Sequence, residues 1–241
     1  MVEIGQWDFA KMENAIRVLS TLALKGALTS LAAAFETQSG AGISADFAPT
    51  LNLLERLEKG ETADIVILTR EGLARLVAQG AVVRETAVDL ARSWVGVAVK
   101  AGQSHPDISS EEAFRTALLA ARSVAYSRLG ASGIYFAQLI VKLGIADQVN
   151  ARASIVPIGL TAERLITGEA DLAIQQISEL KQVKGTEIVG PVPIGLQTPA
   201  VFSAGRLGIA SRVGEADSLL SFLASPQAVP ALEQSGLERV S

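Results

Sequence analysis

Three stretches of the chain combine small residues with hydroxyl side chains at points where a strand is expected to lead into a helix. In an open α/β sheet, ligands bind beyond the carboxyl ends of the strands, and free backbone N–H groups at helix starts attract anions. Hydroxyls at such turns can donate to the anion, or they can cap the helix and nothing more. The turns are Leu19–Ala23 with Ser20 and Thr21, Phe47–Leu51 with Thr50, and Ser127–Gly133 with Ala131, Ser132 and Gly133.

Amide and guanidinium side chains lie close to these turns. Gln175 and Gln176 end an apolar strand, where an amide can point into a cleft or pair with backbone; the spacing leaves both open. Arg128 lies inside the third turn, and Arg70 follows another strand. Arginine binds carboxylates through two parallel N–H donors, although both positions also fit a solvated surface arginine.

Short apolar runs alternate with amphipathic stretches along the whole chain, which predicts an α/β fold with largely parallel sheets. A capping box at Ser109 and Glu112 is expected to open a helix, and Pro230 should bend or shorten the last one. Strands are expected over 16–20, 43–47, 63–68, 94–99, 123–126, 154–157, 170–175 and 187–189, and helices over 24–38, 53–58, 71–78, 109–121, 134–143, 161–167, 216–223 and 225–234.

The composition excludes several chemistries. The chain has no Cys, so disulfides, thiolate nucleophiles and iron–sulfur clusters are ruled out, and no metal or cofactor is expected. The single histidine, His105, sits in a Ser-His-Pro-Asp turn that is typical of a solvated loop rather than of a catalytic base. A net charge of −4 gives no basic face for nucleic acid.

The first twenty residues include Glu3, Asp8, Lys11 and Glu13 and have no apolar core, unlike a secretory signal. No later stretch reaches the roughly 18–20 unbroken apolar residues that span a bilayer. The sequence as written therefore predicts a cytoplasmic protein without membrane insertion. A periplasmic location follows instead if a native signal has been removed.

Six segments, in this order, resemble the molybdate-binding solute-binding proteins, which have the type II periplasmic-binding-protein fold. They cover almost the whole chain after about residue 15. The segments are IRVLSTLALKGALTSLAAAFETQSG, ETADIVILTREGLARLVAQG, WVGVAVKAG, GASGIYFAQLIVKLGI, GEADLAIQQISEL and SPQAVPALEQSGL.

This resemblance implies two lobes, 1–98 plus 200–241 and 99–199, which close on a small anion by a hinge motion. Ser20 and Thr50 would offer hydroxyls, and residues 131–133 would offer backbone N–H groups from the other lobe. Gln176 falls where molybdate binders carry a tyrosine, and Pro49-Thr50 replaces a serine-rich turn. These departures, together with Arg70 and Arg128, favour a di- or tricarboxylate over molybdate. An ABC permease is the partner that the family implies.

The GASG and IQQISEL segments also resemble a branch of the family with aconitate isomerase activity. That reaction shifts a proton next to a carboxylate, so it needs a base and donors for an enolate-like charge. The sequence singles out no residue as this base. Two hypotheses follow: a binding protein for an oxyanion or polycarboxylate, and an isomerase that interconverts cis- and trans-aconitate.

Overall fold

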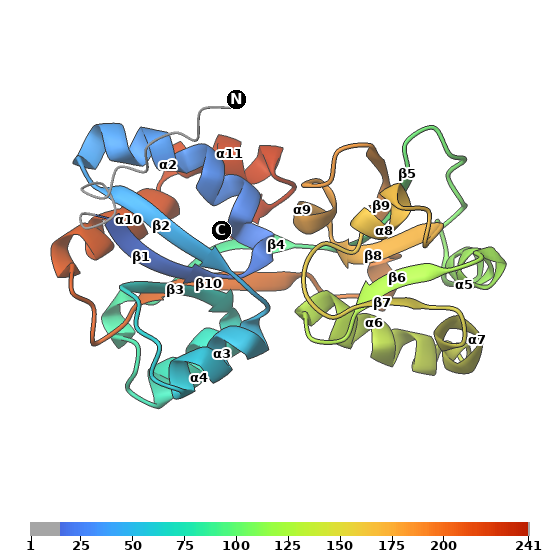
Figure 1. Ribbon diagram of the computed structural model, residues 1–241, viewed down its shortest axis with the longest axis horizontal. Helices are drawn as coiled ribbons and strands as arrows, with labels where there is room; N and C mark the ends of the chain where they lie inside the picture. Colours follow the sequence, from blue (N-terminus) through green and yellow to red (C-terminus); the bar gives the residue numbers. More distant parts are fainter. Residues whose placement is uncertain (1–14, 241) are drawn as a thin grey trace, which may run out of the picture.

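The computed structural model describes residues 15–240 as two lobes, each a β-sheet flanked by helices (Figure 1). The expectations about the first fourteen residues, including that of no secretory signal, fall outside the described residues. The first sheet has six strands in the order β11-β4-β10-β3-β1-β2, and the second has five in the order β7-β6-β8-β5-β9. The two-lobed α/β fold expected from the sequence is confirmed.

The first lobe combines the beginning and the end of the described chain. Its strands are β1 Ala15–Ser20, β2 Gly42–Phe47, β3 Ile65–Thr69, β4 Val88–Ser93, β10 Ala200–Arg206 and β11 Glu238–Arg239. Its helices are η1 Leu22–Leu24, α2 Lys25–Ser39, α3 Thr50–Glu58, α4 Arg70–Ala78, η2 Arg84–Thr86, α10 Val213–Ala224, η4 Pro226–Ala228 and α11 Val229–Gln234.

The second lobe is formed by the middle of the chain. Its strands are β5 Val95–Lys100, β6 Val124–Ser127, β7 Ser154–Val156, β8 Leu172–Gln176 and β9 Thr186–Pro191. Its helices are α5 Glu111–Ala120, α6 Ala131–Lys142, α7 Ala146–Asn150, α8 Glu163–Ile166, α9 Ile177–Leu180 and η3 Ile194–Leu196.

Both sheets are mixed, so the expectation of largely parallel sheets was wrong in this respect. β1 pairs in parallel with β2 and β3, whereas β10 runs antiparallel to β3 and β4. In the second sheet β6 is parallel to β7 and β8, and β5 is antiparallel to β8 and β9. The antiparallel strands β5 and β10 are those that follow the two crossings between the lobes. A buried apolar run has the same pattern in a parallel and in an antiparallel strand, so the sequence does not reveal the direction of β5 and β10.

Two crossing segments join the lobes. The chain leaves the first sheet at Ser93 and enters the second at Val95, so the expected boundary after residue 98 falls inside β5. The return segment reaches β10 at Ala200. The side chain of Gln197 binds the two segments together, because its Oε1 accepts from Val95 N at 2.9 Å and its Nε2 donates to Val95 O at 3.0 Å.

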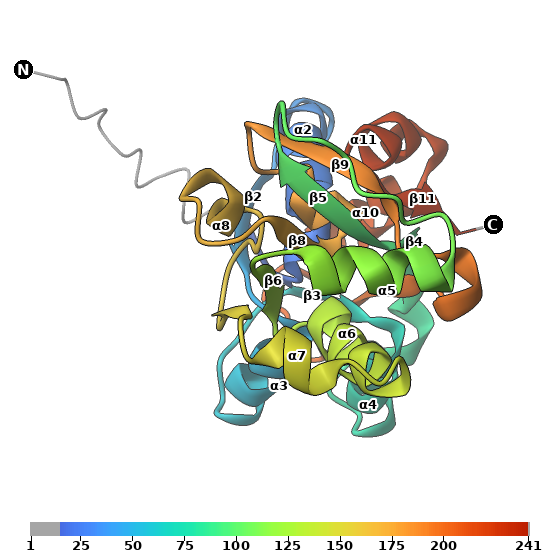
Figure 2. The same ribbon diagram turned by 90° about the vertical axis from the view of Figure 1, so that its right-hand side faces the viewer.

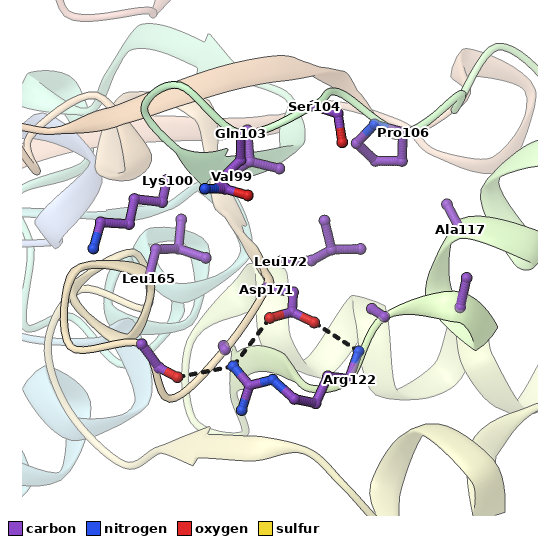
Figure 3. Close-up of a pocket in the computed structure, with 14 residues that line it drawn as sticks. Val99, Lys100, Gln103, Ser104, Pro106, Ala117, Arg122, Leu165, Asp171 and Leu172 are labelled. Atoms are coloured by element: carbon purple, nitrogen blue, oxygen red, sulfur yellow. Dashed lines mark hydrogen bonds and ion pairs between the residues drawn. The ribbon is translucent and has the colours of Figure 1, made fainter.

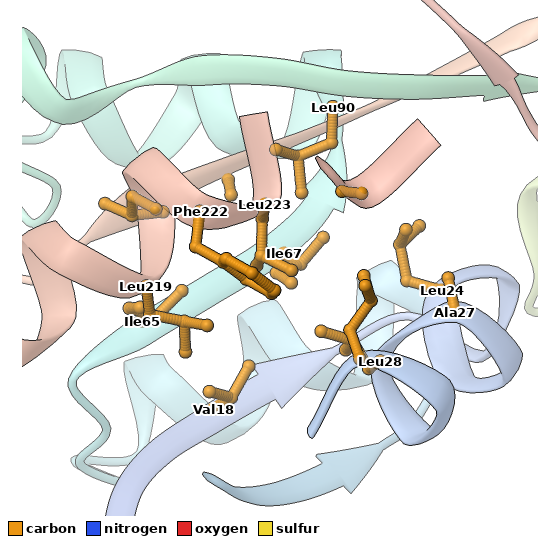
Figure 4. Packing of buried hydrophobic residues seen from close by; sticks show 14 of the residues in the cluster. Val18, Leu24, Ala27, Leu28, Ile65, Ile67, Leu90, Leu219, Phe222 and Leu223 are labelled. Carbon is orange, nitrogen blue, oxygen red and sulfur yellow. The ribbon is translucent and has the colours of Figure 1, made fainter. Parts of the chain in front are cut away.

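Each lobe has its own apolar core. In the first, α2 and α10 pack on the sheet, and the rings of Phe35 and Phe222 lie 5.4 Å apart. Phe222 lies close to Ile67 and Leu223 (Figure 4). In the second, α5, α6 and α7 cover one face of the sheet (Figure 2). The rings of Tyr126 and Phe136 meet edge to face in this core. Two separate cores let the lobes move as rigid bodies about the crossings.

Several elements depart from the sequence prediction. Strand β4 and helices α7 and α9 were not predicted at all. The last predicted helix divides into η4 and α11, with Pro230 in the first turn of α11. Ser225 caps the start of η4, where its side chain accepts from Gln227 N. None of the helices within residues 15–240 has the length and apolar character needed to cross a membrane.

The N-cap of α5 is Ser110, one residue after the predicted Ser109. Ser110 Oγ accepts from Ala113 N at 3.1 Å. We expect Ser110→Ala to lower the free energy of unfolding by about 1 kcal/mol because the N–H group of Ala113 loses this acceptor. Ser109→Ala, the matched control, should leave stability nearly unchanged. Urea denaturation of both variants measures the difference, and equal losses would contradict the assignment of the cap.

Candidate functional site

The three turns predicted from the sequence meet in one cleft between the lobes. The cleft lies where the carboxyl ends of strands from both sheets face each other, as expected for ligand sites in α/β folds. The first lobe lines it with Thr21, Leu22, Pro49, Thr50, Thr69 and Phe202, and the second with Ser127, Gly130, Ala131, Ser132, Gly159, Gln175, Gln176 and Glu179.

Thr21 is the clearest sign that the cleft is built for a ligand. The residue is 4% exposed, and its hydroxyl has no hydrogen-bond partner among the described residues. A buried polar atom without a partner is costly, so such atoms mark places where a ligand or water completes the structure. Its neighbour Ser20 is fully buried, donates to Thr21 O at 3.1 Å, and is not one of the lining residues.

The hydroxyl groups of Thr50 and Thr69 accept hydrogen bonds within the turns of the first lobe and can still donate their own hydrogens. Thr50 Oγ1 accepts from Thr69 N at 3.2 Å, and Thr69 Oγ1 accepts from Gly72 N at 3.3 Å. A hydroxyl that accepts one N–H group still has a hydrogen to donate. Capping and ligand binding are therefore compatible here, and the two interpretations of the sequence need not exclude each other.

In the second lobe, the turn between β6 and α6 exposes a helix N-terminus to the cleft. Ser127 Oγ accepts from Leu129 N and Gly130 N, both at 3.2 Å. Gly130 is the N-cap residue of α6, and because it has no side chain it makes no side-chain capping bond. Ala131 and Ser132 begin this twelve-residue helix and line the cleft. Helix starts of this kind carry unpaired N–H groups and partial positive charge.

Gly133 fulfils a different role from the one expected. It lies behind the cleft, where a Cβ atom would sit 1.7 Å from Ser127 O. Only glycine lets the first turn of α6 pack this closely on the end of β6. Gly133 thus positions the N–H groups of Ala131 and Ser132.

The two glutamines line the cleft and also pair with protein groups, so the two alternatives left by the sequence are compatible. Gln175 holds the loop before α8: its Oε1 accepts from Thr161 N at 2.7 Å and its Nε2 donates to Gly159 O at 3.1 Å. Gln176, with its amide oriented from the hydrogen-bond network, donates to Ser93 O at 3.1 Å in the crossing segment. Gln176 therefore connects the cleft wall to the hinge.

Glu179 is a cleft residue that the sequence analysis missed. It lies on α9, its side chain is buried, and its Oε2 accepts from Gln176 N at 3.3 Å. Burial raises the pKa of the Glu179 carboxyl from 4.5 to about 7, against the lowering effect of Gln176 N–H and the Gln175 side chain. The Gln176-x-x-Glu179 spacing of a capping box was the available signal, but glutamine is not a typical N-cap residue.

The two arginines proposed from the sequence are not among the residues that line the cleft. Arg70 forms an ion pair with Asp89 on the outside of the first lobe. Arg128 is exposed on the turn before α6. His105 is also exposed, with its ring 3.1 Å from Glu187. Within residues 15–240, the cleft lining thus contains neutral donors, one carboxyl group and no cation.

The lobes are closed on each other in this structure. The cleft has a volume of about 30 Å³, which leaves room for roughly one water molecule. Helix α9 packs against η1 and α2 of the opposite lobe, and Gln182 Nε2 donates across the cleft to Leu22 O at 2.9 Å. Any larger ligand must enter while the lobes are apart, which the two-segment hinge allows.

A larger hollow lies on the outer side of the second lobe, between β5, α5 and the end of α8 (Figure 3). Arg122 is its most prominent charged group. This guanidinium already donates to Asp171 Oδ1 at 3.0 Å and to Gly168 O at 2.8 Å. Lys100, Gln103 and Ser104 also line this hollow, which belongs to the second lobe alone, whereas the inter-lobe cleft is formed by residues of both lobes.

Comparisons with known proteins agree with this architecture. Residues 16–238 match the family described as bacterial extracellular solute-binding protein. The chain is 34% identical to an aconitate isomerase from Pseudomonas sp. over 237 residues, which are 96% of this chain and 90% of that protein.

Solved structures also resemble the fold. The periplasmic molybdate-binding protein of Azotobacter vinelandii is 19% identical, with a TM-score of 0.79 over 94% of this chain and all of that one. The sulfate-binding protein of Mycobacterium tuberculosis is 17% identical, with a TM-score of 0.72 over 95% of this chain and 88% of that one.

Two lobes, a hinge of two crossings and donor groups facing each other across a cleft define a periplasmic-binding-protein fold of the molybdate-binding type. The chain belongs to the bacterial extracellular solute-binding protein family. The resemblance drawn from the six sequence segments is thereby confirmed.

Proposed function

We propose that the protein binds a small polycarboxylate anion in the inter-lobe cleft. The observation that carries this proposal is the partnerless hydroxyl of Thr21, a residue that lines the cleft together with the first residues of α6 from the other lobe. Hydroxyl donors and helix N–H groups from opposite lobes can converge on a negative ligand without a cation. Leu22, Pro49 and Phe202 add apolar surface, which suits a carbon skeleton better than an inorganic oxyanion.

The ligand we infer is aconitate, because the chain is 34% identical to an aconitate isomerase over 96% of its length. Calorimetry and thermal shift with cis-aconitate, trans-aconitate, molybdate and sulfate test this inference. We expect both aconitate isomers to raise the melting temperature more than either oxyanion does. A panel in which only molybdate or sulfate stabilises the protein would overturn the assignment.

Replacing Thr21 with valine tests the donor set directly. Thr21→Val keeps the shape of the side chain but removes the hydroxyl, so affinity for aconitate should fall about tenfold, the value of roughly one hydrogen bond to a charged group. Stability without ligand should be unchanged or higher, because the partnerless polar atom is gone. Thr21→Ser, which keeps the hydroxyl, serves as the control and should retain most of the affinity. Unchanged affinity of Thr21→Val would remove Thr21 from the site.

A second function, isomerisation of the bound aconitate, is favoured by Glu179. A buried carboxyl group whose pKa lies near 7 can both accept and give up a proton at neutral pH. A protein that only binds an anion gains nothing from a carboxylate in its binding site, since like charges repel. Ultraviolet absorbance of cis- and trans-aconitate solutions with added protein measures this activity. Unchanged spectra, with binding intact, would leave the binding function alone.

The family description supports a location outside the cytoplasm. For the binding function we propose delivery of the anion to an ABC permease, which the closed lobes would contact. Pull-down of the ligand-bound protein with the permease encoded beside its gene tests this partner. Isomerisation needs no such partner.

A further inference from the structure

The side chain of Gln182, which follows α9, forms a hydrogen bond between the two lobes. Its Nε2 donates to Leu22 O of the first lobe at 2.9 Å and to Ser178 O of its own lobe at 3.1 Å. Leu22 lines the cleft, whereas Gln182 does not. The bond therefore lies outside the cleft lining and is made entirely by groups of the protein.

Helix α9 is attached to the hinge at its beginning and reaches the first lobe at its end. Ile177 N donates to Trp94 O in the first crossing segment at 2.9 Å, and Ser178 Oγ lies 3.4 Å from Ser93 Oγ. Gln182 lies beyond the other end of the helix, which packs on η1 and α2 of the first lobe (Figure 1). Contacts beside the crossing can persist when the lobes rotate apart, whereas the Gln182 bond must break.

The first lobe also approaches α9 closely at the turn that follows α11. A Cβ atom at Gly236 would lie 2.8 Å from Lys181 Cδ and 3.1 Å from Ile177 Cγ2. Gly236 has a φ of +82°, in the left-handed region that favours glycine. The first lobe thus fits the surface of α9 at a second place, and the Gln182 bond belongs to a larger complementary contact.

The amide group of Gln182 is only partly satisfied in this contact. Its Oε1 is buried and has no hydrogen-bond partner among the described residues. Its acceptor, Leu22 O, also accepts from Lys25 N at the start of α2. The bond to Leu22 stabilises the closed arrangement, while the buried Oε1 destabilises it by an amount of similar order. Such a contact holds the lobes together and still breaks readily.

We propose that Gln182 is a latch that holds the lobes closed independently of the ligand and so limits how fast an anion enters and leaves the cleft. The proposal rests on the anion binding proposed above. Leu22 directly follows Thr21, so the latch binds the same turn that carries the partnerless ligand donor. A ligand enters only after the latch has broken, and a bound ligand leaves only after it breaks again. Gln182 is a positioning residue, since it does not line the cleft.

Spin-label distances measured without ligand test the latch directly. The chain has no cysteine, so Ala33→Cys on α2 and Lys184→Cys beyond α9 introduce the only two labelling sites. Both positions are exposed, and each lobe carries one of them. Pulsed electron paramagnetic resonance then reports how far the lobes stand apart in each variant.

Gln182→Glu keeps the size of the side chain but replaces its donors with acceptors. At neutral pH the carboxylate can only face Leu22 O and Ser178 O with oxygen atoms, which repel them. We expect the label distances of the unliganded protein to shift to longer values. Gln182→Ala, which removes the bond without adding charge, should shift them in the same direction. Gln148→Glu makes the same change at an exposed glutamine of the second lobe and should match wild type.

Binding kinetics separate a latch from a purely structural role. Stopped-flow fluorescence with cis-aconitate should show association about threefold faster or more in both Gln182 variants, because a larger fraction of the protein is open. Dissociation should accelerate by at least the same factor, so the affinity stays equal or falls. Damage to the binding site alone would weaken binding without faster association.

Two results would each overturn the latch. One is a distance distribution like that of wild type in both Gln182→Glu and Gln182→Ala, and the other is an association rate like that of wild type in both. A wild-type protein that binds no aconitate would overturn the proposed function instead. The label distances would then decide on the latch by themselves, because that measurement uses no ligand.

Discussion

Gly133→Ala is expected to destabilise the protein and abolish ligand binding. The new Cβ would lie 1.7 Å from Ser127 O and 2.4 Å from Ser127 C, both backbone atoms that cannot rotate away. The start of α6 must therefore move off the end of β6, at a cost of about 3 kcal/mol or more. The N–H groups of Ala131 and Ser132 would move with it.

Gly130→Ala is the matched control on the same turn. A Cβ at Gly130 would meet only Ser127 Oγ, at 3.7 Å, which is an ordinary contact. We expect it to lower the free energy of unfolding by less than about 1 kcal/mol. Urea denaturation and calorimetry with cis-aconitate measure both effects. Similar behaviour of the two variants would mean that the close approach at Gly133 does not set the position of the helix start.

The positions of the strands and of the three turns could be predicted from the sequence because both depend on local patterns. Buried strands such as β3 are continuous apolar runs, and Ser20, Thr50 and Ser132 stand where strands pass into helices. Strand β4 escaped prediction because it contains Asp89 and Arg92. These charges are accommodated by partners remote in sequence: Asp89 by Arg70 and Ser203, and Arg92 by Glu238.

The direction of a side chain could not be predicted in the same way. Arg70 and Arg128 stand next to the right turns, yet neither reaches the cleft lining. The position of a residue in the sequence determines where its Cα atom lies relative to a strand or helix, but the partners of the side chain determine its direction. The partner of Arg70, Asp89, is nineteen residues away. For the same reason Glu179 was missed: the character of its carboxyl group comes from the opposite lobe closing over α9.

The free energy of unfolding should fall as the pH rises from about 5 to 8, and Glu179 should account for this fall. A carboxyl group with a pKa of about 7 in the folded protein, against 4.5 as its ordinary value, binds more protons when folded than when unfolded between these values. The stabilisation is therefore complete below pH 4.5 and is lost as the pH passes through 7. The loss amounts to about 3 kcal/mol for a shift of this size.

Comparison with Glu179→Gln isolates this contribution, because the amide does not titrate. Urea denaturation at pH 5, 6, 7 and 8 should show a falling wild-type curve and a flatter one for the variant, with Glu163→Gln following wild type. Charged residues on α9 and on the elements around it are exposed and are not among the causes of the shift. They are Lys25, Glu36, Lys100, Lys181, Glu187, Glu233 and Glu238.

Parallel curves would mean that Glu179 is ionised in the closed cleft. The carboxyl group would then need no proton at neutral pH, and the repulsion expected between it and an anionic ligand would have to be offset by the donors of the opposite wall.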